Sequence, residues 1–206
     1  MYKGEKFNSL THLTGVIASV VGISLLVAVA IEKNDNWKVI SFSIYGFTLI
    51  SLYTISTIYH SARAGRLKNI FRQLDYMSIY LLIAGSYTPF TLVTLRGGWG
   101  WSLFGTIWTL ALIGIFQEIL IGKKTRRYSL ILYVVMGWLI VIAINPLMAS
   151  LSTTGMWWLS AGGFSYTFGV IFFLLDEKYK HFHGIWHIFV MIGSFCQFFC
   201  LYNYVA

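Results

Sequence analysis

Seven apolar stretches of about twenty residues dominate the chain, and each is long enough to cross the hydrocarbon core of a membrane as a helix. Only 11% of the 206 residues are charged, whereas a soluble domain has about 25%. A water-exposed surface cannot be covered with so few charges. We therefore predict an all-α integral membrane protein that forms a single domain, a seven-transmembrane helical bundle. Pro89 and Pro146 fall inside the third and fifth spans and should disturb those helices. The predicted spans are 13–31, 40–60, 74–95, 99–121, 129–148, 156–175 and 184–204.

The basic residues fall mainly on one side of this predicted bundle. Alternating sides through seven spans puts twelve of the fifteen Lys and Arg residues on the side of the N-terminus. Because cytoplasmic loops carry the excess of Lys and Arg, we expect a multi-pass protein of the cell (inner or plasma) membrane with a cytoplasmic N-terminus and an external C-terminus. The twelve are Lys3, Lys6, Arg63, Arg66, Lys68, Arg72, Lys123, Lys124, Arg126, Arg127, Lys178 and Lys180, and the other three are Lys33, Lys38 and Arg96.

Two competing interpretations fit the sequence less well. The net charge of +8 could suggest a nucleic-acid partner, but such proteins cluster their basic residues on a soluble face, so none is expected. Lys3, Lys6, the following apolar run and Ala28-Val29-Ala30 imitate a cleaved signal peptide. A histidine inside the apolar run, His12, is unusual for a signal, and we expect this run to be the first span.

Ionisable side chains inside the predicted spans are few, and all of them lie at the cytoplasmic end. Such groups are costly in lipid, so each is a candidate functional residue. They come from the first four spans and the last one, and the alternating topology brings them to one layer of the bundle. They are His12, His60, Asp75, Glu118, His183 and His187.

The spacing of two of these histidines suggests a metal site. His183 and His187 are spaced i, i+4, which places both imidazoles on one helix face about one turn apart. Helical zinc sites use this spacing, and a third histidine would complete a site with an open position for water, as in catalytic zinc centres. His60 lies at the same depth and is the natural third ligand. In the alternative interpretation, the pair only hydrogen-bonds to neighbouring helices.

The sequence supports two interpretations of Asp75 about equally. Its carboxylate could accept a hydrogen bond from a metal-bound water, or it could pair with Arg72 one turn earlier at the helix entry. Ser56 lies on the same helix face as His60, so its hydroxyl could point at the site. Hydroxyls in membrane helices usually bond back to their own backbone, which argues against a role for Ser56 from spacing alone.

Three further polar or sulfur-containing residues are given structural interpretations. Glu118 is expected to form an interfacial ion pair with Lys123 or Arg126. Cys196 and Cys200 are also spaced i, i+4, but Cys196 lies roughly 13 Å along the helix from the histidine pair. Both cysteines are therefore expected to be small packing residues.

These residues, taken in order, match the motifs of a known family. The chain resembles the hemolysin III branch of the PAQR (progestin and adipoQ receptor) family over essentially its full length. The stretch Ile83-Ala84-Gly85-Ser86-Tyr87-Thr88-Pro89-Phe90 and the run His183-Gly184-Ile185-Trp186-His187 are similar to those of bacterial members. The dispersed pattern is Glu5-x-x-Asn8-x-x-Thr11-His12, Ser56-x-x-x-His60, Asp75 and His183-x-x-x-His187.

The resemblance implies roles for the matching residues. The wider superfamily includes alkaline ceramidases and adiponectin receptors, with seven helices and a zinc near the cytoplasmic face. By this resemblance the zinc ligands are His60, His183 and His187, Asp75 would deprotonate the zinc-bound water, and Ser56 could stabilise an oxyanion. The N-terminal motif residues Glu5, Asn8 and His12 are interpreted as structural.

Three functions are compatible with this pattern. The first is an intramembrane zinc hydrolase that uses zinc-activated water to cleave a lipid amide or ester, as in ceramidases. The second is a sensor of lipid or fatty-acyl ligands, a regulator of membrane composition, with the same site but no turnover. The third is a pore-forming haemolysin, which we rank last because a channel needs polar residues along its full depth. No protein partner can be inferred.

Overall fold

The structure is a computed structural model that describes residues 5–121 and 126–206, and all regular structure in those residues is helical. Seven helical segments within them are long and apolar enough to cross a membrane, which confirms the predicted fold class. The fifth of these segments is built from three consecutive elements. In chain order the elements are α1 (Lys6–Glu32), α2 (Asn36–Ser61), α3 (Arg66–Pro89), η1 (Phe90–Thr94), α4 (Gly98–Ile121), α5 (Arg126–Trp138), η3 (Leu139–Ala143), α6 (Ile144–Ser150), α7 (Thr153–Leu175) and α8 (Phe182–Tyr204).

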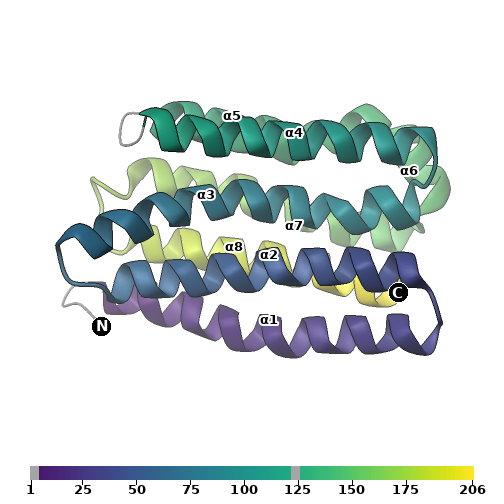
Figure 1. Ribbon diagram of the computed structural model, residues 1–206, viewed down its shortest axis with the longest axis horizontal. Helices are drawn as coiled ribbons and strands as arrows, with labels where there is room; N and C mark the ends of the chain where they lie inside the picture. Colours follow the sequence, from purple (N-terminus) through teal and green to yellow (C-terminus); the bar gives the residue numbers. More distant parts are fainter. Residues whose placement is uncertain (1–4, 122–125) are drawn as a thin grey trace.

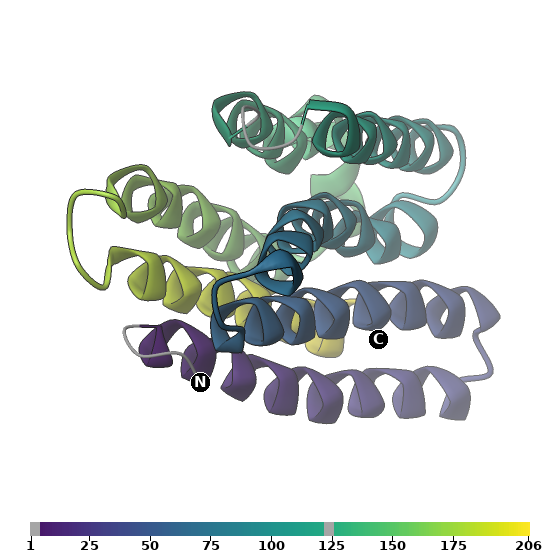
Figure 2. The ribbon, with the colours of Figure 1, turned by 60° about the vertical axis from the view of Figure 1, so that its left-hand side comes forward.

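The central element of the bundle is α3. It packs against α2 on one side and α4 on the other, while α1 packs against α2 and α8, and α7 packs against α8. Figures 1 and 2 show α4 and α5 at one edge of the bundle and α1 at the opposite edge. In the third span 67% of the residues in its apolar stretch are buried, whereas the figure is 22% in the spans formed by α4 and α7. The outer helices therefore turn most of their apolar surface outward, as expected for contact with lipid.

The two ends of the bundle carry different connections (Figure 1). The start of α1, the α2–α3 connection and the α7–α8 connection lie at one end, called here the N-terminal end. The C-terminus and the α1–α2 and α3–α4 connections lie at the other end. Lys3, Lys123 and Lys124 lie outside the described residues, as do the side chains of Arg126 and Arg127.

The observed helices are longer than the predicted spans at the N-terminal end. α1 begins at Lys6 instead of residue 13, and α3 begins at Arg66 instead of residue 74. The prediction counted only the apolar residues that a hydrocarbon core requires, whereas both helices continue as polar turns beyond that core. These extra turns bring residues such as Asn8 and Arg72 into helices.

Both prolines that were expected to disturb their helices coincide with departures from the α-helix. Pro89 is the last residue of α3 and is followed by the π-helical turn η1. Pro146 lies in α6, directly after the 3₁₀ segment η3. A proline ring removes one N–H and clashes with the carbonyl four residues earlier, here Ile142. The break in the fifth span therefore lies on the N-terminal side of Pro146.

The Tyr87 hydroxyl stabilises this break. Its oxygen lies 2.7 Å from the carbonyl oxygen of Met136, to which it donates, and it accepts a hydrogen bond from the N–H of Ile140 at 2.9 Å. Broken helices are tolerated at membrane depth when other groups satisfy the freed backbone atoms. The Tyr87 side chain of α3 thus satisfies backbone groups that the break in the fifth span leaves free.

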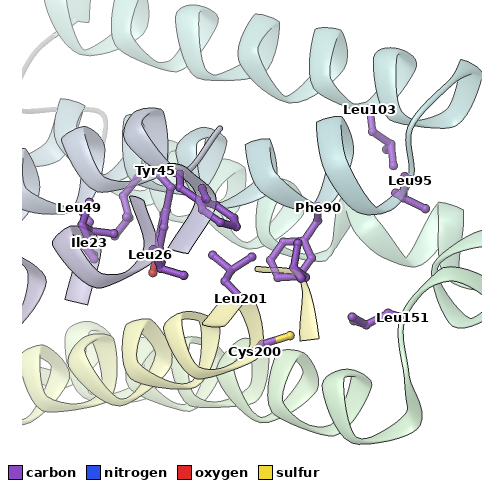
Figure 3. Close-up of a cluster of buried hydrophobic side chains, with 14 of the residues drawn as sticks. Ile23, Leu26, Tyr45, Leu49, Phe90, Leu95, Leu103, Leu151, Cys200 and Leu201 are labelled. Atoms are coloured by element: carbon purple, nitrogen blue, oxygen red, sulfur yellow. The ribbon is translucent and has the colours of Figure 1, made fainter. Parts of the chain in front are cut away.

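A large cluster of buried apolar side chains joins α1, α2 and α8 with the end of the third span. Figure 3 shows Leu26, Tyr45, Phe90 and Leu201 within it. Without a hydrophobic driving force between helices in lipid, close packing through small residues supplies much of the attraction. A Cβ atom added at Gly85 would overlap the Thr48 side chain of α2.

Both cysteines are buried free thiols, as expected for packing residues. Cys200 belongs to the same buried cluster, where it is fully buried.

Candidate metal centre

Three histidines converge at the N-terminal end of the bundle. His60 lies in the last turn of α2, and His183 and His187 lie in the first two turns of α8. One ring nitrogen from each lies within 4.8 Å of the other two. The Nε2 atoms of His60 and His183 are 3.2 Å apart. The residues predicted from the sequence are therefore brought together in a group that could hold a metal ion.

Two of these rings are held from behind by carboxylates. His60 Nδ1 lies 2.6 Å from Glu5 Oε2, and His183 Nδ1 lies 2.7 Å from Asp176 Oδ2. An ionised carboxylate can only accept hydrogen bonds, so both Nδ1 atoms carry the proton. The Nε2 atoms of the neutral rings are then left with lone pairs.

The third ring is oriented by the backbone of α1. His187 Nδ1 lies 3.1 Å from the carbonyl oxygen of Asn8 and 3.1 Å from Thr11 Oγ1. The Thr11 hydroxyl donates to the same carbonyl at 2.8 Å, so its oxygen is free to accept from His187. His187 is fully buried, and its Nε2 atom has no hydrogen-bond partner.

Three imidazole lone pairs therefore face one point. Two of them 3.2 Å apart would repel each other unless a cation lay between them. A proton shared by His60 and His183 would relieve that pair but would leave Nε2 of His187 unpaired. Tetrahedral zinc with bonds of about 2.05 Å separates two ligand nitrogens by about 3.3 Å. Histidine ligands also commonly donate their second N–H to a carboxylate or carbonyl, as all three do here.

Asp75 and Ser56 lie beside this group. Asp75 of α3 is 4% exposed and lies within electrostatic reach of His183 and the Ser56 hydroxyl. Within the described part of the chain, no ion pair joins Asp75 to Arg72, the alternative partner considered from the sequence. Ser56 Oγ is buried and makes no hydrogen bond of normal geometry, not even to its own backbone. Both side chains are therefore available to a molecule bound near the histidines.

A largely apolar cavity of about 230 Å³ lies inside the bundle and reaches His12, whose ring stacks on that of His187. His12 and Asp75 line its polar end. Side chains from α3, α5, η3, α7 and α8 form its walls, and it reaches Ile144 and Leu147 of α6 toward the opposite end. The broken fifth span thus lines the cavity.

One residue that contacts the histidines is not singled out by the sequence analysis, and the structure gives specific contacts to two others. Asp176 was not considered, although an acidic residue at the end of an apolar span, seven residues before His183, was a usable signal. Glu5 and Asn8 are interpreted as structural from the sequence; in the structure the Glu5 carboxylate contacts the ring of His60 and the Asn8 carbonyl contacts the ring of His187.

The Glu5 carboxylate also binds a cation. Lys68 Nζ donates to Glu5 Oε1 at 2.6 Å, while the other carboxylate oxygen faces His60. Burial would raise the pKa of the Glu5 carboxyl, but the hydrogen bonds from His60 and Lys68 outweigh it and hold that pKa below its usual value. Glu5 therefore stays ionised as a partner for His60.

Glu118 contributes to a different part of the same end. It is 1% exposed and accepts a hydrogen bond from Ser129, while Gln73 Nε2 donates to its backbone carbonyl at 2.8 Å. Lys123 and the side chain of Arg126, its expected partners, lie outside the described residues.

The fold and the site define a class of protein: a seven-helix integral membrane protein with a group of three histidines, two buried and one half-buried, that could hold a metal. The model of the Haemolysin-III related family matches residues 1–198, and the chain belongs to this family of membrane proteins. The resemblance to the hemolysin III branch noted from the sequence motifs is thereby confirmed.

Similar proteins come from bacteria and mammals. The chain is 43% identical to Hemolysin-3 of Bacillus cereus over 203 residues, which cover 98% of this chain and 92% of that protein. It is 41% identical to the Hemolysin-3 homolog of Bacillus subtilis (strain 168), over 98% of this chain and 94% of that protein. It is 30% identical to the human Monocyte to macrophage differentiation factor, over 96% of this chain and 83% of that protein.

Proposed function

We propose that the protein is an intramembrane zinc hydrolase that cleaves a lipid amide or ester. The observation that carries this proposal is the convergence of three imidazole nitrogens whose opposite ring atoms are already paired. When bound there, zinc would activate water at neutral pH and polarise the substrate carbonyl. The residues fit this ion because the donor set is three histidines with an open fourth position, as in catalytic zinc sites.

The two neighbouring side chains supply the remaining chemistry. Asp75 would take a proton from the attacking water as its oxygen bonds to the carbonyl carbon, and would return it to the leaving nitrogen or oxygen as that bond breaks. The Ser56 hydroxyl would donate to the carbonyl oxygen as negative charge develops on it. Its hydroxyl is buried, lies beside Asp75 and does not bond back to its own backbone, which supports this role.

The cavity supports a lipid substrate. Its walls are mainly apolar, and His12 and Asp75 stand at the end nearest the histidines. A single acyl chain lying along it would place its carbonyl at that end. The cavity would thus hold the chain while the polar group meets the catalytic residues.

We also propose that the three histidines lie near the cytoplasmic face of the cell membrane. They occupy the N-terminal end of the bundle, where the connections carry Arg63, Lys178 and Lys180 and α3 begins at Arg66. Basic residues accumulate on the cytoplasmic side of membrane proteins.

Hydrolysis of a lipid panel by purified protein tests this proposal. The panel contains ceramide-like amides, N-acyl ethanolamides and matched esters in detergent. Asp75→Asn should keep zinc but lose turnover by about 100-fold or more, because an amide cannot accept the proton. Arg72→Ala is the matched control on the same helix, and its activity per folded molecule should equal that of wild type.

Two outcomes would contradict the proposal. Hydrolysis that survives intact in Asp75→Asn would exclude Asp75 as the base. A zinc-loaded wild type that binds acyl lipids but cleaves none of them would identify the site as that of a lipid sensor.

A further inference from the structure

His12 of α1 is a buried imidazole whose nitrogens have no hydrogen-bond partner among residues 5–121 and 126–206. Its side chain is 2% exposed, and neither Nδ1 nor Nε2 makes a hydrogen bond. Its ring stacks on His187 with a centroid separation of 3.6 Å and an interplanar angle of 13°, and it meets the ring of Tyr53 at 5.1 Å and 67°. It lines the cavity beside Asp75. The role already proposed for the three histidines does not use it.

The stacking geometry excludes His12 as a further ligand of the same ion. A histidine binds a metal through a lone pair in its ring plane, at about 2.0–2.1 Å. Two nearly parallel rings 3.6 Å apart have no point within bonding distance of both that lies in both ring planes. An ion placed between the planes would be about 1.8 Å out of each.

Packing alone does not account for an imidazole at this position. A buried polar group without a hydrogen bond is unfavourable, and an apolar ring of similar size would stack on His187 and Tyr53 without that cost. The other three histidines of this layer each have a partner for Nδ1. His12 differs from them in facing the cavity with both nitrogens unpaired.

We propose that His12 binds the polar head of the acyl ligand and selects a head that carries both a hydrogen-bond donor and an acceptor. This inference rests on the proposed function, in which the cavity holds the acyl chain. A neutral imidazole offers one N–H donor and one acceptor nitrogen, which point in different directions and need two partner atoms. An amide with an N–H or a nearby hydroxyl supplies both, whereas a simple ester supplies acceptors only.

The binding of two ligands with the same chain tests this selectivity. N-oleoylethanolamine and methyl oleate are titrated against zinc-loaded Asp75→Asn protein, which keeps both ligands intact, by displacement of a fluorescent fatty acid. The amide should bind at least about 10-fold more tightly, because the ester leaves one imidazole nitrogen unpaired. In the double variant with His12→Phe the two affinities should agree within about two-fold, since neither nitrogen remains.

Further variants separate recognition from structure. His12→Gln keeps a donor and an acceptor and should restore part of the preference, while His12→Leu repeats the loss if the phenylalanine variant does not fold. Zinc content and melting temperature are measured for each protein. A preference for the amide that persists in His12→Phe or His12→Leu would overturn the inference and leave the proposed function intact.

Two other outcomes are equally decisive. Loss of zinc from both His12→Leu and His12→Gln would show that His12 serves to hold the His187 ring in place, and this would overturn the inference. Failure of the zinc-loaded protein to bind either ligand would overturn the proposed function, and the inference with it.

Discussion

The Nε2 atoms of His60 and His183 face each other at 3.2 Å, while their Nδ1 atoms are held by carboxylates from two different segments of the chain. One carboxylate precedes α1 and the other follows α7. Two imidazoles fixed in this way present lone pairs to each other, which is unfavourable without a cation between them. Residues 55 and 7 positions away in sequence thus hold the two rings in an arrangement that could bind a metal ion.

The first prediction concerns metal content. Protein purified without chelators should carry about one zinc per chain, and His187→Ala should remove it because two histidines no longer supply a stable inner shell. His181→Asn is the control, because His181 precedes the same helix but is outside the three-histidine group, and asparagine tolerates its left-handed φ of 71°. Elemental analysis of the three proteins gives the result. Full retention of zinc in His187→Ala would show that the ligands are wrongly assigned.

The second prediction concerns the carboxylates behind the rings. Asp176→Asn should weaken zinc binding by about 10- to 100-fold, because the amide orients His183 less firmly and lowers its basicity. The neighbouring substitution Glu177→Gln should leave zinc affinity unchanged. Competition with a chelator of known affinity measures both. Equal affinities for all three proteins would mean that the contact between Asp176 and His183 does not tune the metal site.

The third prediction concerns orientation in the membrane. A reporter active only outside the cytoplasm should work when fused after Ala206 and should be silent when inserted after Ala64, in the α2–α3 connection. These two positions lie at opposite ends of the bundle, and the basic residues near Ala64 predict that this end is cytoplasmic. The reverse pattern of activity would move the three histidines to the external face.

The fourth prediction concerns the broken fifth span. Tyr87→Phe should lower the free energy of unfolding by about 1–3 kcal/mol, because it leaves the N–H of Ile140 without its partner in a buried region. Tyr202→Phe is a suitable control, since Tyr202 is 40% exposed. Unfolding in mixed detergent measures both changes. Equal stability of Tyr87→Phe and wild type would mean that another group satisfies the backbone at the break.

The seven spans and the identity of the three histidines that meet follow from the order of the amino acids alone. An apolar run that crosses lipid forms a helix, because each backbone N–H and C=O must find its hydrogen-bond partner within the segment. The i, i+4 spacing of His183 and His187 fixes them on one helix face, and span alternation brings His60 to the same layer. Each of these inferences needs only local periodicity and a count of the crossings.

The surroundings of those rings depend on how the helices pack in three dimensions. Asp176 reaches His183 because the chain turns through His181, whose φ of 71° is left-handed, before α8 begins. Asp75 could not be assigned from spacing, and its nearness to His183 depends on how α3 packs on its neighbours. His12 matched a motif, but its stacking on His187 depends on how α1 packs against α8. Contacts between helices depend on rotation and depth of each helix, which hydropathy and helical periodicity leave undetermined.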